Sequence, residues 1–252
     1  MASMPRSILA RLTPRHLAAT VLMLISIGLA AGSIAALQGN LAYLQGKTLL
    51  SHLQLQQDEL EPAVGSTHYM RAHMRLQRAA ELVPNHAQYH TIQAQLSLYG
   101  FAHGYADGVE LRTAKEQLLH SLSLRPSWPY TWLELAKVSY SLDGINDSVW
   151  QYLKQAQQYG PFIKEVNITS VEFYLLYYAE LNAEQRQALR TQLQRALVQR
   201  DGAWLLWERA QLRMRKTLLC HEVAKLQQQH QVMNNLCKRA QANFASVADN
   251  PA

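Results

Sequence analysis

An uncharged apolar segment near the start of the chain is the feature that most constrains its fold. Leu17 to Leu37 reads LAATVLMLISIGLAAGSIAAL, which is 21 consecutive residues without a charge. As a helix rising about 1.5 Å per residue this segment is ~31 Å long, which matches the ~30 Å hydrocarbon core of a bilayer. The sequence therefore predicts a transmembrane helix over residues 17–37.

The charges that flank this segment predict its orientation. Arg6, Arg11 and Arg15 precede it with no acidic residue before Asp58, whereas Lys47 is the only Lys or Arg in the first ~20 residues after it. The positive-inside rule places the more basic flank in the cytoplasm. We therefore expect a single-pass protein of a bacterial inner membrane, with a cytoplasmic N-terminus and a periplasmic C-terminal domain.

Two further interpretations of the apolar segment stay open. Ser33-Ile34-Ala35 resembles the cleavage site of a secretory signal, although the apolar run is longer than the about 7–15 residues usual for a signal core. Gly28 and Gly32 match the small-xxx-small pattern by which two membrane helices approach closely, which predicts a homodimer contact at these glycines. The alternative is that Gly28 and Gly32 face lipid and contact no second helix.

The rest of the chain is predicted to be helical. There are 11 Gly and 8 Pro in 252 residues, about 8 % against a typical ~12 %, which argues against a turn-rich β-sandwich. Apolar residues after residue 38 recur at helical spacing, and Gly and Pro mark the helix ends. The expected helices are Leu41–Glu61 (stopped by Pro62 and Gly65), Thr67–Leu82, Gln88–Tyr99, Val109–Leu124, Tyr130–Ser141, Asn146–Tyr159, Ser170–Leu181, Asn182 to about Arg200, Ala203–Gln229 and a final stretch to Asn243.

One spacing of small and large residues recurs before three prolines. The sets are Ala72, Leu76, Ala79 before Pro84; Ala114, Leu118, Ser121 before Pro126; and Val149, Leu153, Ala156 before Pro161. Together with Trp132-x2-Leu135-Ala136, this pattern resembles tetratricopeptide repeats, in which a helix pair recurs about every 34 residues. The resemblance covers about residues 67–178, and a generic helical bundle is the alternative.

The resemblance implies an all-α fold in which an N-terminal transmembrane helix precedes a TPR-like helical repeat domain. The expected order is a cytoplasmic tail (1–16), the transmembrane helix (17–37), a connecting helix (38–66), the repeats (67–178) and a C-terminal helical cap (179–252). In the repeat family certain positions line a groove that binds partners. Carried onto this sequence, they are Gln88, Thr91, Gln95, Leu98 and Tyr99 in one unit and Tyr130, Leu133, Lys137, Tyr140 and Ser141 in the next.

The two cysteines predict a disulfide. Cys220 and Cys237 both follow the membrane segment, and an even pair in an oxidising compartment is typically bonded. Two buried thiols are the alternative.

No set of residues predicts catalysis, a metal or a cofactor. His86-x3-His90 has the spacing of two metal ligands without a third, and a nucleophile elbow, a P-loop and a dinucleotide fingerprint are all missing. The net charge of +6 is modest, so nucleic acid is not an expected partner.

The layout as a whole resembles one group of bacterial proteins. An N-terminal anchor, a short helical-repeat domain, the stretch Pro126–Ala136 (PSWPYTWLELA) and a cysteine-bearing C-terminal segment are similar to accessory proteins of exopolysaccharide synthesis and export systems. The resemblance implies a non-catalytic scaffold that binds proteins of this inner-membrane and periplasmic machinery. Two other functions stay open: an assembly factor for cytochromes or other envelope complexes, and a helical glycan hydrolase that would use carboxylates such as Glu134 or Glu172.

Overall fold

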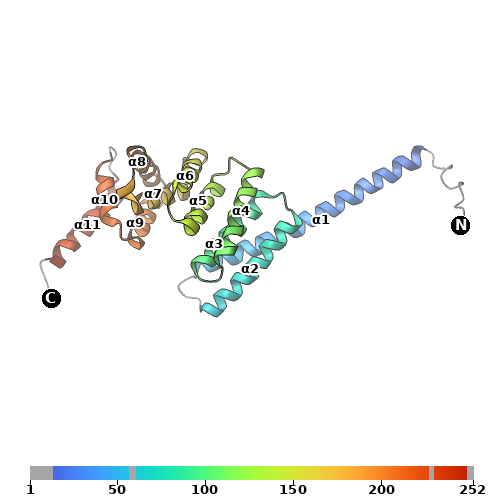
Figure 1. The fold of residues 1–252 in the computed structure, drawn as a ribbon, viewed down its shortest axis with the longest axis horizontal. Helices are drawn as coiled ribbons and strands as arrows, with labels where there is room; N and C mark the ends of the chain where they lie inside the picture. Colours follow the sequence, from blue (N-terminus) through green and yellow to red (C-terminus); the bar gives the residue numbers. More distant parts are fainter. Residues whose placement is uncertain (1–13, 57–60, 227–229, 249–252) are drawn as a thin grey trace. The chain divides into compact units, whose positions relative to one another are not determined.

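The computed structural model describes residues 14–56, 61–226 and 230–248, and within these ranges the chain is helical and has no strand (Figure 1). The predicted all-α class is therefore confirmed. A short 3₁₀ turn, Tyr178–Glu180, follows α7. The helices are α1 (Pro14–Leu55), α2 (Pro62–Leu82), α3 (Ala87–Ala102), α4 (Gly108–Leu124), α5 (Pro129–Asp143), α6 (Asp147–Tyr159), α7 (Lys164–Leu176), α8 (Ala183–Leu197), α9 (Gly202–Leu212), α10 (Lys216–Ala224) and α11 (Gln231–Ala248).

The chain divides into two compact units, residues 1–117 and 118–252. The first unit holds α1, α2, α3 and the start of α4. The second unit begins inside α4 and holds α5 to α11. Each unit has its own buried apolar clusters, and each is described separately.

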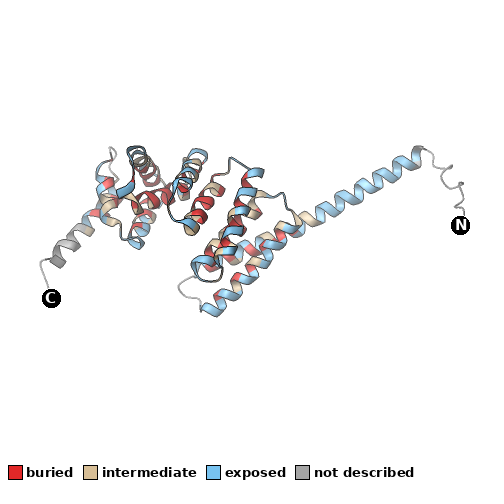
Figure 2. Cartoon of the chain, in the orientation of Figure 1, coloured by how far each residue is buried: buried red, intermediate tan, exposed pale blue. Residues whose placement is uncertain are grey.

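Helix α1 runs without a break from the predicted transmembrane segment into the region after it. Its stretch from Leu17 is long and apolar enough to cross a membrane, and the side chains from Leu17 to Ile34 are exposed (Figure 2). From Gly39 onward one side of the helix is buried. The candidate anchor and the first packed helix are thus one element, which ends at Leu55 and not at the predicted Glu61.

The second part of α1 packs antiparallel against α2. The buried positions lie three or four residues apart on both helices, as in coiled coils. Two glycines allow close approach, because a Cβ on Gly46 would lie 2.6 Å from Leu76 Cγ and one on Gly39 would lie 2.9 Å from Val83 Cγ2. The buried positions are Gly39, Ala42, Gly46, Leu50 and Leu53 on α1 and Gly65, Tyr69, Ala72, Leu76 and Ala79 on α2.

This packing corrects the predicted connecting helix over residues 38–66. Residues 38–55 form the first helix of a pair, and the second helix begins at Pro62 and not at Thr67. Proline is tolerated in the first turn because its missing N–H would have no helical partner there. Gly65 does not stop a helix: it lies inside α2, where a Cβ would collide with the hydroxyl of Tyr105.

The second unit is built from helix pairs. Helix α5 packs with α6, α7 with α8 and α9 with α10. The first helices of successive pairs also pack on each other, α5 on α7 and α7 on α9, and α8 packs on α10. The pairs therefore form two layers, with α5, α7 and α9 in one of them (Figure 1).

The small and large residues that precede the three prolines are core positions of α2, α4 and α6. All nine are completely buried: Ala72, Leu76, Ala79, Ala114, Leu118, Ser121, Val149, Leu153 and Ala156. The same spacing recurs at Leu189, Leu193 and Ala196 in α8 and at Leu219 and Val223 in α10 with Leu226 just after it, all buried. The pairing therefore continues past residue 178 into the predicted cap, where no proline follows the pattern.

Other helix ends confirm or correct the sequence predictions. The predicted helix start at Asn182 is confirmed, and a capping box forms it: Asn182 Oδ1 accepts from the Gln185 N–H and Gln185 Oε1 accepts from the Asn182 N–H, both at 2.9 Å. Helix α7 begins at Lys164, earlier than the predicted Ser170. A single helix over Ala203–Gln229 is wrong, because Met214 adopts φ 53° and separates α9 from α10. This left-handed residue ends a helix in the way that a glycine usually does.

Candidate partner-binding face

Polar and charged side chains gather on the layer formed by α5, α7 and α9. On each helix they recur at intervals of three or four residues, which places them on one side of that helix. The set, called the charged face below, consists of Glu134 and Lys137 on α5, Glu165, Thr169 and Glu172 on α7, and Arg209 and Arg213 on α9.

Lys137 joins α5 to α7. Its Nζ lies 3.1 Å from Glu134 Oε1 and 3.6 Å from Glu165 Oε1. The Thr169 hydroxyl donates to the same Glu165 oxygen at 3.2 Å. The amine thus bridges two carboxylates on neighbouring helices, and its side chain stays 25 % exposed, so an approaching partner can reach it.

Glu172 joins α7 to α9. Arg213 Nε donates to Glu172 Oε1 at 2.8 Å, and Arg209 Nη1 lies 3.6 Å from Glu172 Oε2. The Glu172 side chain is only 12 % exposed, whereas those of Arg209 and Arg213 are about half exposed, at 45 % and 51 %. Each guanidinium therefore anchors on a shielded carboxylate and keeps further donors open to solvent.

The two groups of charges influence each other. Burial on its own lowers the pKa of Lys137, but the negative charges of Glu134 and Glu165 outweigh it, and the pKa lies above its ordinary value. The Arg209 guanidinium opposes this rise. Lys137 is therefore protonated at neutral pH, and it lies close enough to Arg209 for their charges to interact.

Beside the charged face, α7 and α9 pack tightly together. Glu172, Arg209, Arg213 and Arg215 lie around buried apolar side chains of both helices, and the space left between them is only about 10 Å³; the apolar residues are Ile168, Val171, Leu175, Leu206 and Ala210. A space of this size holds at most one water, so a partner would meet the arginines and not an apolar hollow. Three arginines against one carboxylate leave this edge positively charged, and it suits an acidic side chain of a partner because arginine binds carboxylates in a fork.

The residues predicted on α5 divide into exposed and structural positions. Lys137 belongs to the charged face, and Tyr130 and Ser141 lie at helical spacing on either side of it and are half-buried. Leu133 is completely buried in the core, so it cannot touch a partner in this fold. The Tyr140 hydroxyl lies 3.1 Å from that of Tyr177, and burial and this hydrogen bond raise the pKa of Tyr177 to about 12.

The residues predicted on α3 belong to the first unit, and α1 covers part of their surface. Thr91 and Tyr99 are buried, and the Tyr99 hydroxyl donates to the Leu53 carbonyl at 3.0 Å. The Gln88 side chain hydrogen-bonds Tyr43 of α1. Tyr99 and Gln88 therefore contact α1 where the prediction placed an open groove, and Thr91 is buried. Gln95 and Leu98 are half-buried, and their role stays a prediction.

Sequence reasoning missed most of the charged face. Arg209 and Arg213 were not singled out, and Glu172 was considered only as a carboxylate of a possible hydrolase. Polar residues at 165, 169 and 172 recur at intervals of four and three residues in α7, which was an available signal for a polar side of that helix. The pairing with α9 had no signal, since 41 residues separate Glu172 from Arg213.

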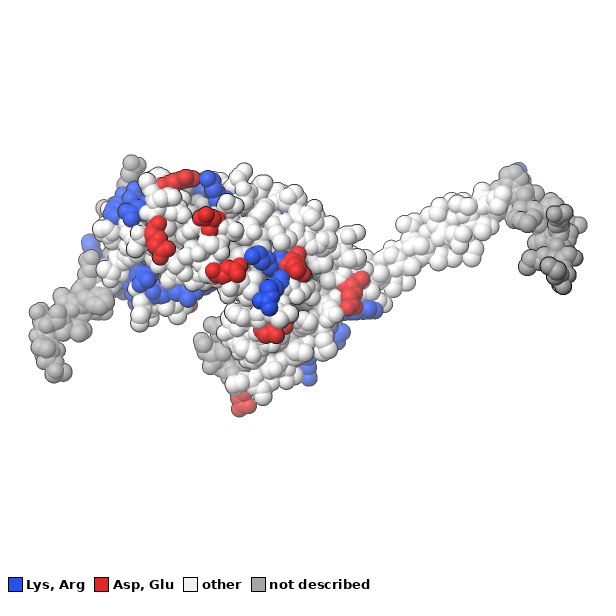
Figure 3. Space-filling model, viewed as in Figure 1, with Lys and Arg blue, Asp and Glu red and all other residues white. Residues whose placement is uncertain are grey.

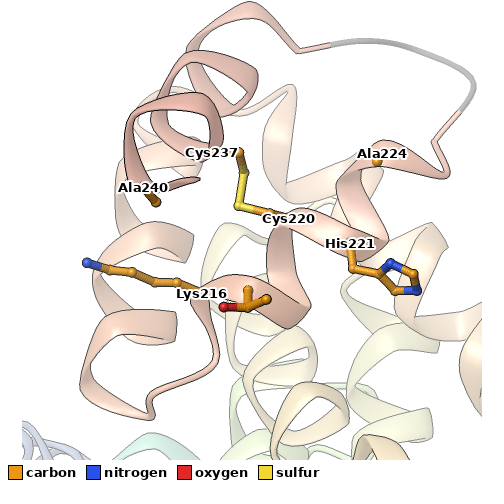
Figure 4. Close-up of a pocket in the computed structure, with 7 residues that line it drawn as sticks. Lys216, Cys220, His221, Ala224, Cys237 and Ala240 are labelled. Atoms are coloured by element: carbon orange, nitrogen blue, oxygen red, sulfur yellow. A yellow bond between two sulfur atoms is a disulfide. The ribbon is translucent and has the colours of Figure 1, made fainter. Parts of the chain in front are cut away.

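The predicted cysteine pair is joined in the structure. Cys220 on α10 and Cys237 on α11 form a disulfide, with their Cα atoms 5.6 Å apart (Figure 4). The bond lies in a pocket that Lys216, Thr217, His221, Ala224 and Ala240 also line. Lys216 Nζ lies 4.6 Å from the centre of the Trp207 ring, which holds this amine on α9. The disulfide therefore fixes α11 to the last helix pair.

A buried carboxylate reinforces the same region. Glu222 is completely buried and lies 2.6 Å from Lys225 Nζ, 2.6 Å from the Tyr178 hydroxyl and 3.4 Å from Arg190 Nε. Burial alone raises the pKa of Glu222, but the hydrogen bonds from Lys225 and Tyr178 outweigh it and hold the pKa below its ordinary value. Glu222 is thus a charged structural centre that links α8, α10 and the 3₁₀ turn.

A second polar centre lies in the first unit. Glu110 accepts hydrogen bonds from the Tyr69 and Ser97 hydroxyls and lies 3.7 Å from His73 Nε2. Burial, together with Glu110, raises the pKa of Tyr69. Tyr69 is buried and Gly100 packs against its ring, so this centre connects helices of the first unit, while the Glu110 and His73 side chains stay partly exposed.

Among the residues that the structure describes, no group of three or more His, Cys, Asp or Glu side chains is placed to hold a metal ion. His90 Nε2 instead lies 2.7 Å from the Pro84 carbonyl, and His86 stacks on Tyr89. Comparisons with protein-family models and with curated proteins find no match to this chain. The functional argument therefore rests on the geometry of the charged face and on the layout of the chain.

Proposed function

We propose that the protein is a membrane-anchored scaffold that binds a protein partner through the charged face on α5, α7 and α9. Its helical domain is periplasmic in this proposal, and α1 anchors it in a bacterial inner membrane. The arginines before the apolar segment support this orientation. The partner is a component of a polysaccharide synthesis or export machinery, which the resemblance of the whole layout supports.

One observation carries the proposal. Glu134 and Glu172 are shielded and paired, while the Arg209 and Arg213 side chains beside them stay about half exposed, at 45 % and 51 %. A catalytic acid or base needs access to a reacting atom, whereas Glu134 and Glu172 are held by cations on the same face. Exposed arginines are instead typical of protein-binding surfaces.

Site-specific photocrosslinking in living cells tests this proposal. A photoreactive phenylalanine analogue replaces Tyr130 or Ser141, which flank the charged face on α5, in the full-length chain. The matched control positions are the exposed Gln151 on α6 and Gln194 on α8, which belong to the other helices of their pairs. We expect one adduct of discrete mass from the positions on α5 and none from the controls.

A second variant links that adduct to the arginines. Changing Arg209 and Arg213 together to Gln removes the exposed donors without altering the buried apolar residues, and it should abolish the adduct at Tyr130. An adduct that persists in this variant, or that forms equally at Gln151, contradicts the proposal.

A further inference from the structure

A basic groove lies on the first unit, where α1 leaves its uncharged stretch. It is lined by Leu44, Gln45, Thr48 and Leu49 of α1 and by Arg71, Met74, Arg75 and Arg78 of α2. The three arginines are spaced by four and three residues and therefore share one side of α2. In Figure 3, blue side chains follow the edge of α2 beside the white stretch of α1.

The charged residues that line this groove are all positive. No acidic residue lines it, and among the described residues no carboxylate lies within ion-pair distance of Arg71 or Arg75. Arg78 Nη1 lies 3.6 Å from Glu81, but both side chains are more than half exposed, and such a pair is weak. The groove therefore presents positive charge that the described part of this chain leaves largely uncompensated.

The groove is also apolar. Leu44 is 56 % exposed and Met74 is 58 % exposed, and both line the groove together with the arginines. Leu44 is seven residues, or roughly 10 Å, past Leu37, so these apolar side chains lie farther out along α1 than Arg78 does.

The position of the groove along α1 identifies the ligand. Ala79, next to Arg78, packs against Gly39, which is two residues past the uncharged segment. Arg78 is thus about 3 Å along the axis from Leu37, inside the polar headgroup layer, which is roughly 5–7 Å thick on each side of a bilayer. Arg75 and Arg71 lie farther out, because their neighbours Leu76 and Ala72 pack against Gly46, which is nine residues or roughly 13 Å past Leu37 and beyond the headgroup layer.

We propose that the end of this groove nearest the membrane, at Arg78, binds the headgroup of an anionic phospholipid in the membrane that α1 enters, and that Arg75 and Arg71 attract the same negatively charged surface from farther out. The inference rests on α1 being membrane-inserted, but it does not depend on the charged face or its partner. Because the arginines lie at increasing distance from the bilayer, their contributions should fall in the order Arg78, Arg75, Arg71. A ligand from solution would not produce this order.

The test uses the full-length chain in nanodiscs made from equal parts of phosphatidylcholine and phosphatidylglycerol, with the retained lipids counted by native mass spectrometry. We expect phosphatidylglycerol to be enriched over phosphatidylcholine in the wild type. An arginine near an anionic surface strengthens binding about fivefold, so Arg78→Gln should lower the enrichment by about that factor and Arg71→Gln by much less. Changing all three to Gln should remove it.

A triple variant with the same change in net charge is the matched control. Arg112, Arg200 and Arg239 are exposed and lie outside the groove, and changing them to Gln should leave the enrichment intact. Thermal melts of both triple variants check that each still folds.

Three results would overturn the proposal. The first is a lack of enrichment in the wild type. The second is equal weakening at the three positions with displacement of the lipid by inorganic phosphate, which would identify a soluble anion. The third is unchanged enrichment in the groove variant with loss of binding to a polyuronate, which would identify an acidic polymer. The photocrosslinks at Tyr130 and Ser141 are independent of all three results.

Discussion

Gly39 and Gly46 allow α1 to lie directly on α2, because each occupies a position where a side chain would overlap the opposite helix. They differ in this from Gly28 and Gly32, around which an added Cβ would meet nothing within 4 Å in this chain. The predicted homodimer contact at Gly28 and Gly32 stays a prediction. The close approach that the structure does contain is formed by glycines that the sequence analysis had not singled out.

Gly46→Val should therefore destabilise the first unit. The new side chain would overlap the completely buried Leu76, and overpacking of this kind costs about 1–3 kcal/mol. Thermal unfolding in detergent measures the effect, and Gly28→Val is the matched control, with no expected change. Equal midpoints for the two variants would show that Gly46 does not determine the packing of α1 on α2.

Glu222 predicts an acid-sensitive fold in the second unit. Its folded-state pKa lies below the unfolded value of about 4.3, so its ionised form stabilises the fold above that pH, and this contribution is lost as the pH falls through the folded pKa. Glu222→Gln should lower the free energy of unfolding at pH 7 by about 2 kcal/mol, because the buried side chain loses the charge of a carboxylate that accepts hydrogen bonds from Lys225 and Tyr178. Chemical denaturation between pH 7 and pH 3 should show the difference from the wild type shrinking below about pH 4.3. The exposed Glu208→Gln is the control, and a difference that does not depend on pH would contradict this role.

The sequence predicted the residues whose role is local and missed those whose role depends on distant packing. All nine second-helix positions were predictable because a small or apolar residue at fixed spacing is what two paired helices need in order to touch. Lys137 was identified only through the repeat resemblance. Arg209 and Arg213 acquire their role from the packing of α9 on α7, and no spacing within α9 reveals it.

The ends of the helices also divide into those that local residues mark and those that they do not. Ends marked by proline, glycine or a capping residue, such as the start of α8 after Asn182, were predicted within a few residues. The break between α9 and α10 was missed because a methionine, Met214, takes the left-handed conformation there. The pairing of α1 with α2 was missed because nothing in the continuous helix marks where the exposed stretch ends.

The disulfide between Cys220 and Cys237 holds α11 in place. It closes a segment with a sequence separation of 17, and in the chain-entropy model such a loop stabilises the fold by about 3 kcal/mol. Replacing Cys220 and Cys237 together by Ser should therefore speed hydrogen exchange in α11, while exchange in α5 and α6 stays unchanged. Unaltered exchange in α11 would show that Met233 and Leu236 alone hold this helix in the core.

The whole molecule combines one candidate membrane helix with two helical units, and its orientation decides where the charged face works. Arg6, Arg11 and Arg15 predict a cytoplasmic N-terminus. A reporter enzyme that is active only in the periplasm, fused after Ala252, should be active, and a cytoplasmic reporter at the same position should be inactive. The reverse pattern would contradict the proposed localisation.

The central claim is that a surface, and not a catalytic group, carries the function. Complementation of a deletion strain tests it most directly. Glu134→Gln, Glu165→Gln and Glu172→Gln, each made singly in the full-length chain, should retain nearly all activity, because each change leaves the exposed donors of the charged face in place. Tyr130→Ala combined with Arg209→Gln should lose most of the activity while the thermal midpoint of the protein stays close to that of the wild type, because Arg209 is about half exposed and Arg213 still pairs with Glu172. A single carboxylate variant that abolishes complementation while folding normally and keeping the Tyr130 photocrosslink would contradict the account and indicate an enzyme.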